Sequence, residues 1–358
     1  MDSDRDRITV LDMLRGVAAL IVVIWHFRWY FTTPFPKLLL PFYLGGWAAV
    51  DLFFVISGFI LTKIYYSETP KSGELKEFAI HRFARIYPLH FLTLIVVAAL
   101  IAISGQPGLY SGYRANDLYH FILNLFLLQW AGDSFNAPSW SISTEMFANV
   151  FLAIAIFYFR GIQGKILCVL GLLISIVLFV GFLQIFSNAF ILQTALGFLS
   201  GCLLAFWHGS IRIQRGYVAT AIFIICVVVW ILWMLFASTL HARANLSERV
   251  SHVGLVVIIF PAMIISGIQS PLISRISGWR FFTWLGEISY SVYLWHFPVA
   301  CILVLTQVTR SGITAEGLLP LYLATVLLVS HLSFIFIEGP ARRGILSLAG
   351  LRRTSAKS

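Results

Sequence analysis

The stretch LRGVAALIVVIWHF, residues 14–27, is an apolar run typical of a membrane-spanning helix. Similar runs recur along the whole 358-residue chain, and only 11% of the residues are charged, whereas about 25% are charged in a soluble domain. An α-helix satisfies all its backbone hydrogen bonds internally, as hydrocarbon requires. The sequence therefore predicts an all-α, polytopic membrane helical bundle.

Ten apolar runs approach the roughly 20 residues that a helix needs to cross a bilayer. An eleventh run, residues 117–130, has only fourteen residues and is predicted to form a short re-entrant or half-crossing helix. The ten predicted spans are residues 9–31, 47–66, 86–104, 140–159, 166–186, 188–208, 217–236, 250–268, 284–308 and 317–338.

The distribution of Lys and Arg predicts the orientation. With the N-terminus inside and residues 117–130 not crossing, eighteen of these residues are cytoplasmic and five lie outside; if that run crosses, ten are inside and thirteen outside. The positive-inside rule favours the first arrangement, with both termini cytoplasmic in a plasma or inner membrane. Residues 1–343 then form the membrane domain and residues 344–358 a basic cytoplasmic tail. The net charge of +10 is explained by these loops and does not indicate nucleic acid.

Several kinds of site find no support in the sequence. No metal-ligand spacing, P-loop, GxSxG elbow, HExxH or GxGxxG motif occurs, so neither a bound metal nor a permanent cofactor is predicted. All four cysteines fall inside apolar runs and are interpreted as buried structural thiols: Cys168, Cys202, Cys226 and Cys301.

Two ionisable residues stand in the first span. Arg15 and His26 are eleven residues apart, which places them on nearly the same helix face with a rise of about 16 Å between them. Because an ionisable group facing lipid costs several kcal/mol, that face is expected to point into the protein. Asp12 lies about one turn from Arg15 and is a candidate partner for it.

Two carboxylates are expected to lie near His26. In the preferred orientation Asp51 is close to the outer end of the second span, and Glu145 lies about a turn and a half into a span that enters from outside. A histidine beside carboxylates suits a general base whose tautomer is oriented by its neighbour. The alternative is structural, because each residue can also bind helices together, and Asp51 can also neutralise Arg28.

At the opposite face the stretch HRFARIYPLHF, residues 81–91, places Arg82 and Arg85 one helical turn apart. One interpretation is a positive-inside anchor that touches anionic lipid. The other is an anion site, because guanidinium groups bind phosphates through paired hydrogen bonds.

Taken in order, these motifs resemble acyltransferase family 3, whose members are integral-membrane enzymes that acylate surface polysaccharides, lipo-oligosaccharides, peptidoglycan and some antibiotics. The resemblance extends from Leu11 to Arg343. It implies a ten-helix bundle that moves an acyl group, often acetyl, from cytoplasmic acyl-CoA to a hydroxyl at or beyond the outer face. It is carried by LDMLRGVAALIVVIWHF, VDLFFVISGFIL, HRFARIYPLHFL, PSWSISTEMF, LGEISYSVYLWHFPV and FIEGPARR.

The family's functional positions match residues of this chain. The span-one pair, the cytoplasmic arginine motif and the tryptophan-to-glutamate motif correspond to Arg15 and His26, Arg82 and Arg85, and Trp140 and Glu145. The chain departs from the family at Ala48-Ala49, at His81, in the stretch MFANVF, and at Glu338-Gly339-Pro340, where Glu-Lys-Pro is usual. Many members of the family carry an extra extracytoplasmic hydrolase-like domain, and no such domain is expected in these 358 residues. The chain is therefore expected to finish the transfer itself or to hand over to a separate protein.

The resemblance suggests a mechanism in two parts. Acyl-CoA, a substrate rather than a resident cofactor, is expected to dock its phosphates on Arg82 and Arg85, with Arg15 nearby. Its pantetheine arm would run along the Arg15 and His26 face toward the outer half of the membrane.

There His26, oriented by Asp51 or Glu145, would remove the proton from the hydroxyl of a glycan or lipid-linked saccharide. Direct transfer and an acyl-histidine relay both fit this arrangement.

Two other classes remain open. A transporter or flippase of a polysaccharide precursor or an acyl group would also place ionisable groups along one helix face. A non-catalytic partner of polysaccharide assembly proteins would tolerate replacement of the charged positions. Membrane lipids are expected partners in every case.

Overall fold

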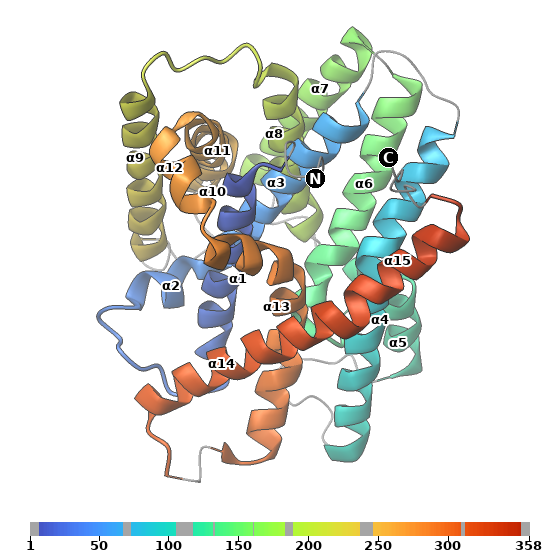
Figure 1. Ribbon diagram of the computed structural model, residues 1–358, viewed down its shortest axis with the longest axis vertical. Helices are drawn as coiled ribbons and strands as arrows, with labels where there is room; N and C mark the ends of the chain where they lie inside the picture. The colour runs from blue at the N-terminus through green and yellow to red at the C-terminus, as the bar shows by residue number, and fades with distance from the viewer. Residues whose placement is uncertain are drawn as a thin grey trace, which may run out of the picture. The chain divides into compact units, whose positions relative to one another are not determined.

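The computed structural model describes most of the chain, and in that part every regular element is a helix (Figure 1). The described residues are 7–66, 73–104, 117–131, 133–159, 161–182, 189–236, 246–308 and 312–351. The fold class predicted from the sequence is therefore confirmed. Of the predicted basic tail, residues 352–358 lie outside the described part.

Nine helices in the described ranges are long and apolar enough to cross a membrane, and each overlaps a predicted span. The one predicted span that remains, residues 140–159, coincides with helix α6, Trp140–Tyr158. Sequence hydropathy misplaces one boundary by a wide margin, because α4 begins at Glu74 rather than near residue 86. The eight-residue helix α5, Leu118–Leu125, is about 12 Å long and too short to cross, as expected for residues 117–130.

The helices fall into two compact units. The first unit, residues 1–66 and 159–290, holds α1 (Thr9–Phe27), α2 (Leu40–Gly45), α3 (Ala49–Tyr65), α7 (Ile162–Phe182), α8 (Ala189–Trp207), α9 (Gly216–Phe236), α10 (Leu246–Gly254), α11 (Phe260–Gln269), α12 (Pro271–Ser277) and the start of α13 (Arg280–Leu305). The second, residues 67–158 and 291–358, holds α4 (Glu74–Ser104), α5, α6, the rest of α13, α14 (Ala315–Ser333) and α15 (Gly339–Leu348).

Glycines bring α3 and α8 into close contact within the first unit. A Cβ atom added at Gly58 would lie 2.0 Å from the carbonyl oxygen of Phe198, and one added at Gly201 would lie 2.0 Å from that of Val55. No side chain fits at either point, so the two backbones touch directly. Small residues serve this purpose in membrane bundles, where close packing replaces the hydrophobic effect as the driving force.

In the described part of the chain, two spans contain a π-helical turn just before a proline. Residues Leu255–Ile259 precede Pro261, and residues Phe334–Glu338 precede Pro340. Proline has no N–H group, and its ring clashes with the carbonyl four residues earlier in an α-helix. The wider hydrogen bonding of a π turn lets each helix continue through the proline.

A third proline, Pro298, stands inside α13 and leaves the carbonyl of Leu294 without its helical donor. The side-chain amide of Asn136 replaces that donor, since its Nδ2 lies 3.0 Å from the Leu294 oxygen. Both residues belong to the second unit, so this bond ties α13 to the segment just before α6.

Candidate functional site

Arg82 and Arg85 lie on one turn of α4, well inside the helix. Arg82 is eight residues from the first residue of α4, which corresponds to about 12 Å along the helix axis. The sequence-based expectation that these arginines and Glu145 belong to opposite faces of the membrane is wrong. Arg82 Nη2 lies 2.6 Å from Glu145 Oε1. The error arose because hydropathy places the start of this span twelve residues too late.

The Arg82–Glu145 ion pair is largely shielded from solvent. The Arg82 side chain is 14% exposed and that of Glu145 is 19% exposed. The Nε–H group of Arg82 is buried and finds no hydrogen-bond partner among the residues that the structure describes. A buried donor without an acceptor is costly, so this side of the guanidinium group is suited to an oxyanion.

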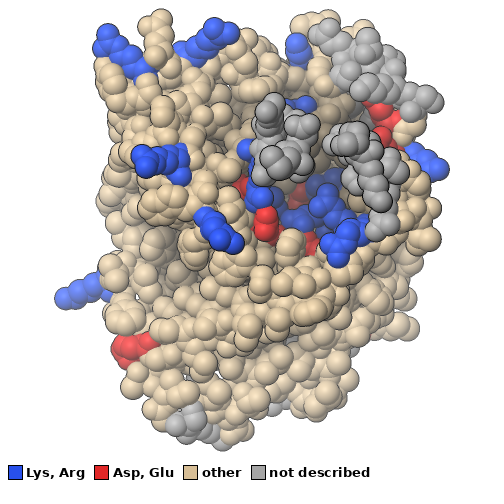
Figure 2. Space-filling model, in the orientation of Figure 1, with Lys and Arg blue, Asp and Glu red and all other residues tan. Residues whose placement is uncertain are grey.

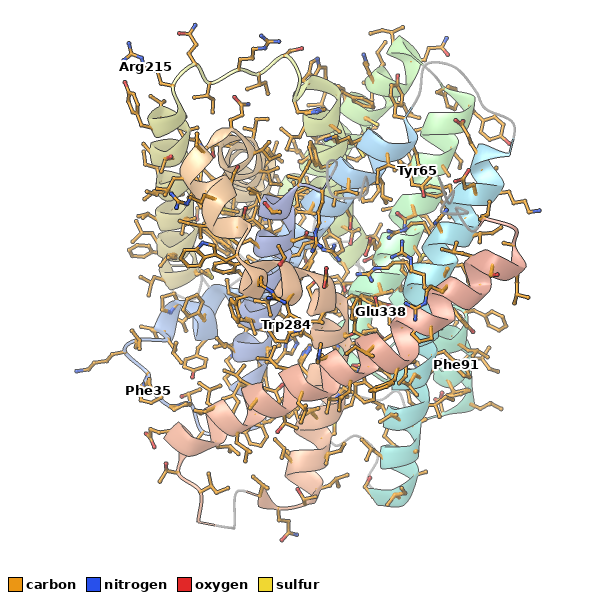
Figure 3. The ribbon with its side chains drawn as sticks, viewed as in Figure 1. Phe35, Tyr65, Phe91, Arg215, Trp284 and Glu338 are labelled. Atoms are coloured by element: carbon orange, nitrogen blue, oxygen red, sulfur yellow. The ribbon has the colours of Figure 1, made fainter. Side chains whose placement is uncertain are left out.

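Arg85 forms a second ion pair, with Glu338. Arg85 Nη1 contacts Glu338 Oε1, and the hydroxyl of Ser291 donates to Glu338 Oε2 at 2.8 Å. Glu338 is the last residue of the second π turn and lies where α14 gives way to α15 (Figure 3). The carboxylate is thus held at both oxygens, with its side chain only 3% exposed. Arg82, Arg85, Glu145, Glu338 and Ser291 are called the arginine cluster below.

Figure 2 shows acidic and basic side chains close together in one area of the face drawn, further charged side chains mainly near its edges, and tan residues over most of the rest. This is the distribution expected for a chain with few charged residues whose outer surface meets lipid.

Asp51 does not orient His26, and this expectation from the sequence is wrong. Its Oδ2 atom lies 3.0 Å from Nε2 of His252, and both side chains are buried. The Oδ1 atom is also buried and has no hydrogen-bond partner among the described residues. The pair joins the start of α3 to α10 within the first unit.

Aromatic rings surround His252. The ring centroids of Trp47, Phe179 and Trp233 lie 5.0, 5.2 and 5.6 Å from that of the imidazole. A carboxylate and an imidazole enclosed in this way are strongly dependent on each other, because water cannot easily replace either partner.

His26 is oriented by the backbone of its own helix. Its Nδ1 atom lies 3.0 Å from the carbonyl oxygen of Val22. A carbonyl only accepts hydrogen bonds, so Nδ1 carries the proton and the neutral ring has its lone pair on Nε2. This is the form that a general base requires.

The other residue pairing suggested for span one is also wrong. Asp12 pairs with Arg7, whose Nε lies 2.5 Å from Asp12 Oδ2, rather than with Arg15. Arg7 also reaches Glu287 at 2.7 Å. Arg15 itself is partly buried on α1.

Sequence reasoning missed two partners that the structure reveals. His252 lies inside the predicted span 250–268, so an ionisable residue at membrane depth was the available signal. Glu338 was noted only as part of a motif, although it ends the predicted span 317–338 next to Gly339-Pro340. The predicted boundary between residues 343 and 344 falls inside α15.

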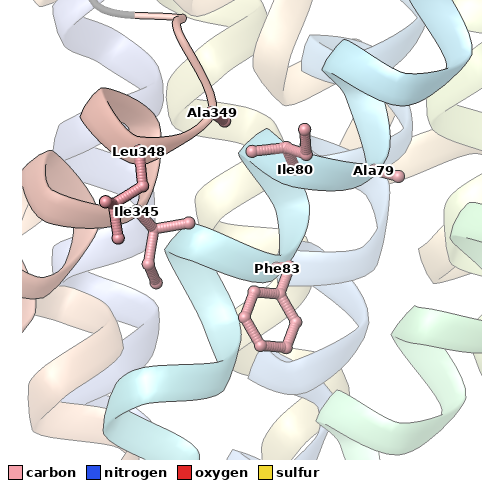
Figure 4. Close-up of a pocket in the computed structure, with 6 residues that line it drawn as sticks. All are labelled: Ala79, Ile80, Phe83, Ile345, Leu348 and Ala349. Atoms are coloured by element: carbon pink, nitrogen blue, oxygen red, sulfur yellow. The ribbon is translucent and has the colours of Figure 1, made fainter.

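A separate groove lies between α4 and α15, which pack side by side in the second unit (Figure 4). Its volume is about 480 Å³, and it contains no ionisable or nucleophilic side chain. Group transfer therefore has no chemical basis there. The lining residues are Ala79, Ile80, Phe83, Ile345, Leu348 and Ala349.

Comparison with known proteins points to one family. A family described as an acyltransferase domain matches residues 8–338. Peptidoglycan O-acetyltransferase OatA of Listeria monocytogenes is 26% identical over 376 residues, which cover 95% of this chain and 56% of the relative. No solved structure shows a significant match.

Two further relatives are similar at the same level. Putative peptidoglycan O-acetyltransferase YrhL of Bacillus subtilis is 24% identical, with 93% of this chain and 54% of the relative covered. O-acetyltransferase OatA of Staphylococcus aureus is also 24% identical, with 93% and 57% covered. The chain spans about half the length of these curated relatives.

Proposed function

Because the chain belongs to the acyltransferase domain family, we propose that it is an integral-membrane O-acyltransferase. In this proposal an acyl group, acetyl in the first instance, passes from cytoplasmic acyl-CoA to a hydroxyl of an extracytoplasmic or lipid-linked glycan. The relatives are named O-acetyltransferases, two of them with peptidoglycan as the acceptor, and these names support the reaction and the acceptor class. The positive-inside distribution of Lys and Arg supports cytoplasmic termini.

The single observation that carries the chemistry is the hydrogen bond from His26 Nδ1 to Val22. It leaves Nε2 as the proton acceptor of the neutral ring. In the proposed reaction Nε2 takes the proton as the acceptor oxygen attacks the thioester carbonyl. The carbon–sulfur bond then breaks, and the imidazolium returns the proton to the departing thiolate. Asp51 has no part in orienting this base, because it is bonded to His252.

The donor is proposed to bind through its phosphates at Arg82 and Arg85, which lie one turn apart on α4. The unused Nε–H of Arg82 supports this assignment, because phosphate oxygens accept paired hydrogen bonds from guanidinium groups. In this scheme acyl-CoA is a substrate that leaves as free CoA. A transporter or flippase would move its substrate without consuming acyl-CoA, so release of free CoA separates the two classes.

Replacing His26 tests the proposed base. His26→Ala should lower acyl transfer roughly 100- to 10,000-fold, because general-base help is worth that much. The assay is release of CoA from acetyl-CoA by the purified protein in lipid nanodiscs, with a glycan acceptor present.

His208→Ala is the matched control. His208 also hydrogen-bonds a backbone carbonyl through Nδ1, at 2.7 Å from the oxygen of Ala205, but it directly follows the last residue of α8 and has no role in the proposal. Wild-type activity in the His26→Ala variant would remove His26 from the mechanism.

A further inference from the structure

The two glutamates of the arginine cluster hold their arginines in different ways, and we propose that this difference is functional. Glu145 is a displaceable partner that occupies Arg82 while the acyl donor is absent and is released when a donor phosphate takes its place. Glu338 is a permanent anchor that keeps Arg85 in position throughout. This inference rests on the proposed donor site at Arg82 and Arg85.

Glu338 is built to stay in place. Arg85 and Ser291 each bond one of its carboxylate oxygens, and the side chain is 3% exposed. Displacing it would leave a buried carboxylate without its hydrogen-bond partners, which is unfavourable in a low-dielectric interior.

Glu145 is placed where it can exchange. Its side chain is 19% exposed, about six times the exposed fraction of Glu338. It stands on a regular stretch of α6, one and a half turns from the helix start, with no proline or π turn in α6. A side-chain rotation can therefore remove its carboxylate from Arg82 without a change in the backbone.

Arg82 has hydrogen-bonding capacity that Glu145 does not use. A guanidinium group offers five N–H donors, and the Nε–H of Arg82 is buried without a hydrogen-bond partner in the described part of the chain. A phosphate group presents several oxygens and can engage Nε and a terminal nitrogen together. It satisfies the orphaned donor, which gives the exchange a driving force.

The charge of the cluster leads to the same conclusion. Two arginines and two glutamates sum to zero in the structure as it stands. A neutral cluster attracts a polyphosphate weakly, and a carboxylate left beside the phosphate repels it. Release of Glu145 restores one positive charge at the donor site. The freed carboxylate becomes available as a proton acceptor only when the donor is bound.

The two glutamates are therefore expected to respond in opposite directions to the same conservative change. The purified protein in nanodiscs is titrated with coenzyme A, and the Kd is measured by calorimetry. Glu145→Gln should lower the Kd roughly ten-fold, because a neutral amide competes with the phosphate for Arg82 less strongly than a carboxylate does. Glu338→Gln should raise the Kd by a similar factor, because Arg85 loses its anchor.

Glu77→Gln is the matched control. Glu77 lies on α4 outside the arginine cluster, where its carboxylate is 3.6 Å from His81. An unchanged Kd is expected there. A Kd lowered as much as in Glu145→Gln would mean that net charge alone causes the effect, and would overturn the proposal. So would a Glu145→Gln variant whose Kd is unchanged or raised.

Wild-type protein provides a second measurement that needs no glutamate variant. Carboxyl groups are labelled with a carbodiimide and glycine ethyl ester and located by mass spectrometry. Coenzyme A should increase labelling of Glu145 and leave Glu338 poorly labelled; decreased labelling of Glu145 would also overturn the exchange.

Arg82→Gln separates this inference from the proposed function. If that variant and Arg85→Gln both bind coenzyme A as tightly as wild type, the donor site itself is wrong. If they bind weakly while Glu145→Gln gives no gain, only the exchange is wrong.

Discussion

The pair formed by Asp51 and His252 should show strong energetic coupling, and its environment indicates how much. Each residue is buried, the two contact atoms are 3.0 Å apart, and the second carboxylate oxygen has no hydrogen-bond partner in the described residues. Replacing His252 by Leu would leave a wholly buried carboxylate with neither oxygen bonded. Replacing Asp51 by Leu would leave an imidazole enclosed by aromatic rings.

Removing one partner of a buried ionic pair costs about 3–5 kcal/mol, whereas replacing both partners by apolar residues is often close to neutral. Each single variant, Asp51→Leu or His252→Leu, should therefore lose stability within that range. His252→Leu should lose more, because an unbonded carboxylate is harder to bury than a neutral imidazole. The double variant should be more stable than either single variant.

A double-mutant cycle measures the coupling. Unfolding of the four proteins in mixed micelles is followed by Trp fluorescence, to which Trp47 and Trp233, which pack against His252, contribute together with the chain's other tryptophans. Losses that add to within about 0.5 kcal/mol would refute the reasoning, because independent sites behave in that way. A double variant less stable than both singles would refute it as well.

Two further predictions concern the second unit. Asn136→Ala leaves the buried carbonyl of Leu294 without a hydrogen-bond donor and should lower the free energy of unfolding by about 1–3 kcal/mol. Unfolding in mixed micelles measures this loss. A loss below about 0.5 kcal/mol would mean that water replaces the amide. The backbone N–H and the ring of His120 hydrogen-bond the carboxylate of Asp117 and lower its pKa. The stability that this helix cap gives α5 should therefore be fully present above the ordinary aspartate pKa of about 3.9, and should be lost as the pH falls through the lower pKa of the folded state. Amide exchange at α5 follows that loss, and Asp117→Asn should remove the pH dependence, because asparagine caps without titrating.

The membrane fold follows directly from the sequence. A bilayer demands about 20 apolar residues per crossing helix, and this requirement is local, so each span can be recognised without its neighbours. The short helix after residue 117 is recognised by the same rule. The rule does not fix helix boundaries, because polar residues can extend a helix past its apolar run, as the first twelve residues of α4 do.

The candidate residues also follow from the sequence, because ionisable side chains in apolar runs are rare and therefore conspicuous. His26, Asp51, Glu145 and the two arginines of α4 are all identifiable in this way. Their hydrogen-bond and ion-pair partners cannot be identified from the sequence. The structure pairs Glu145 with an arginine 63 residues earlier in the chain and Asp51 with a histidine 201 residues later.

Partners of this kind depend on which helix faces meet and at what height, and neither quantity is written in the local pattern of a span. The register between α3 and α8 is set by glycines that allow two backbones to touch, and the register of α15 relative to α14 is shifted by the π turn between them, ahead of a proline. Hydropathy therefore determines how many helices enter the membrane and which side chains are unusual there. Tertiary packing alone decides which charges neutralise one another, because that choice is made between helices rather than within them.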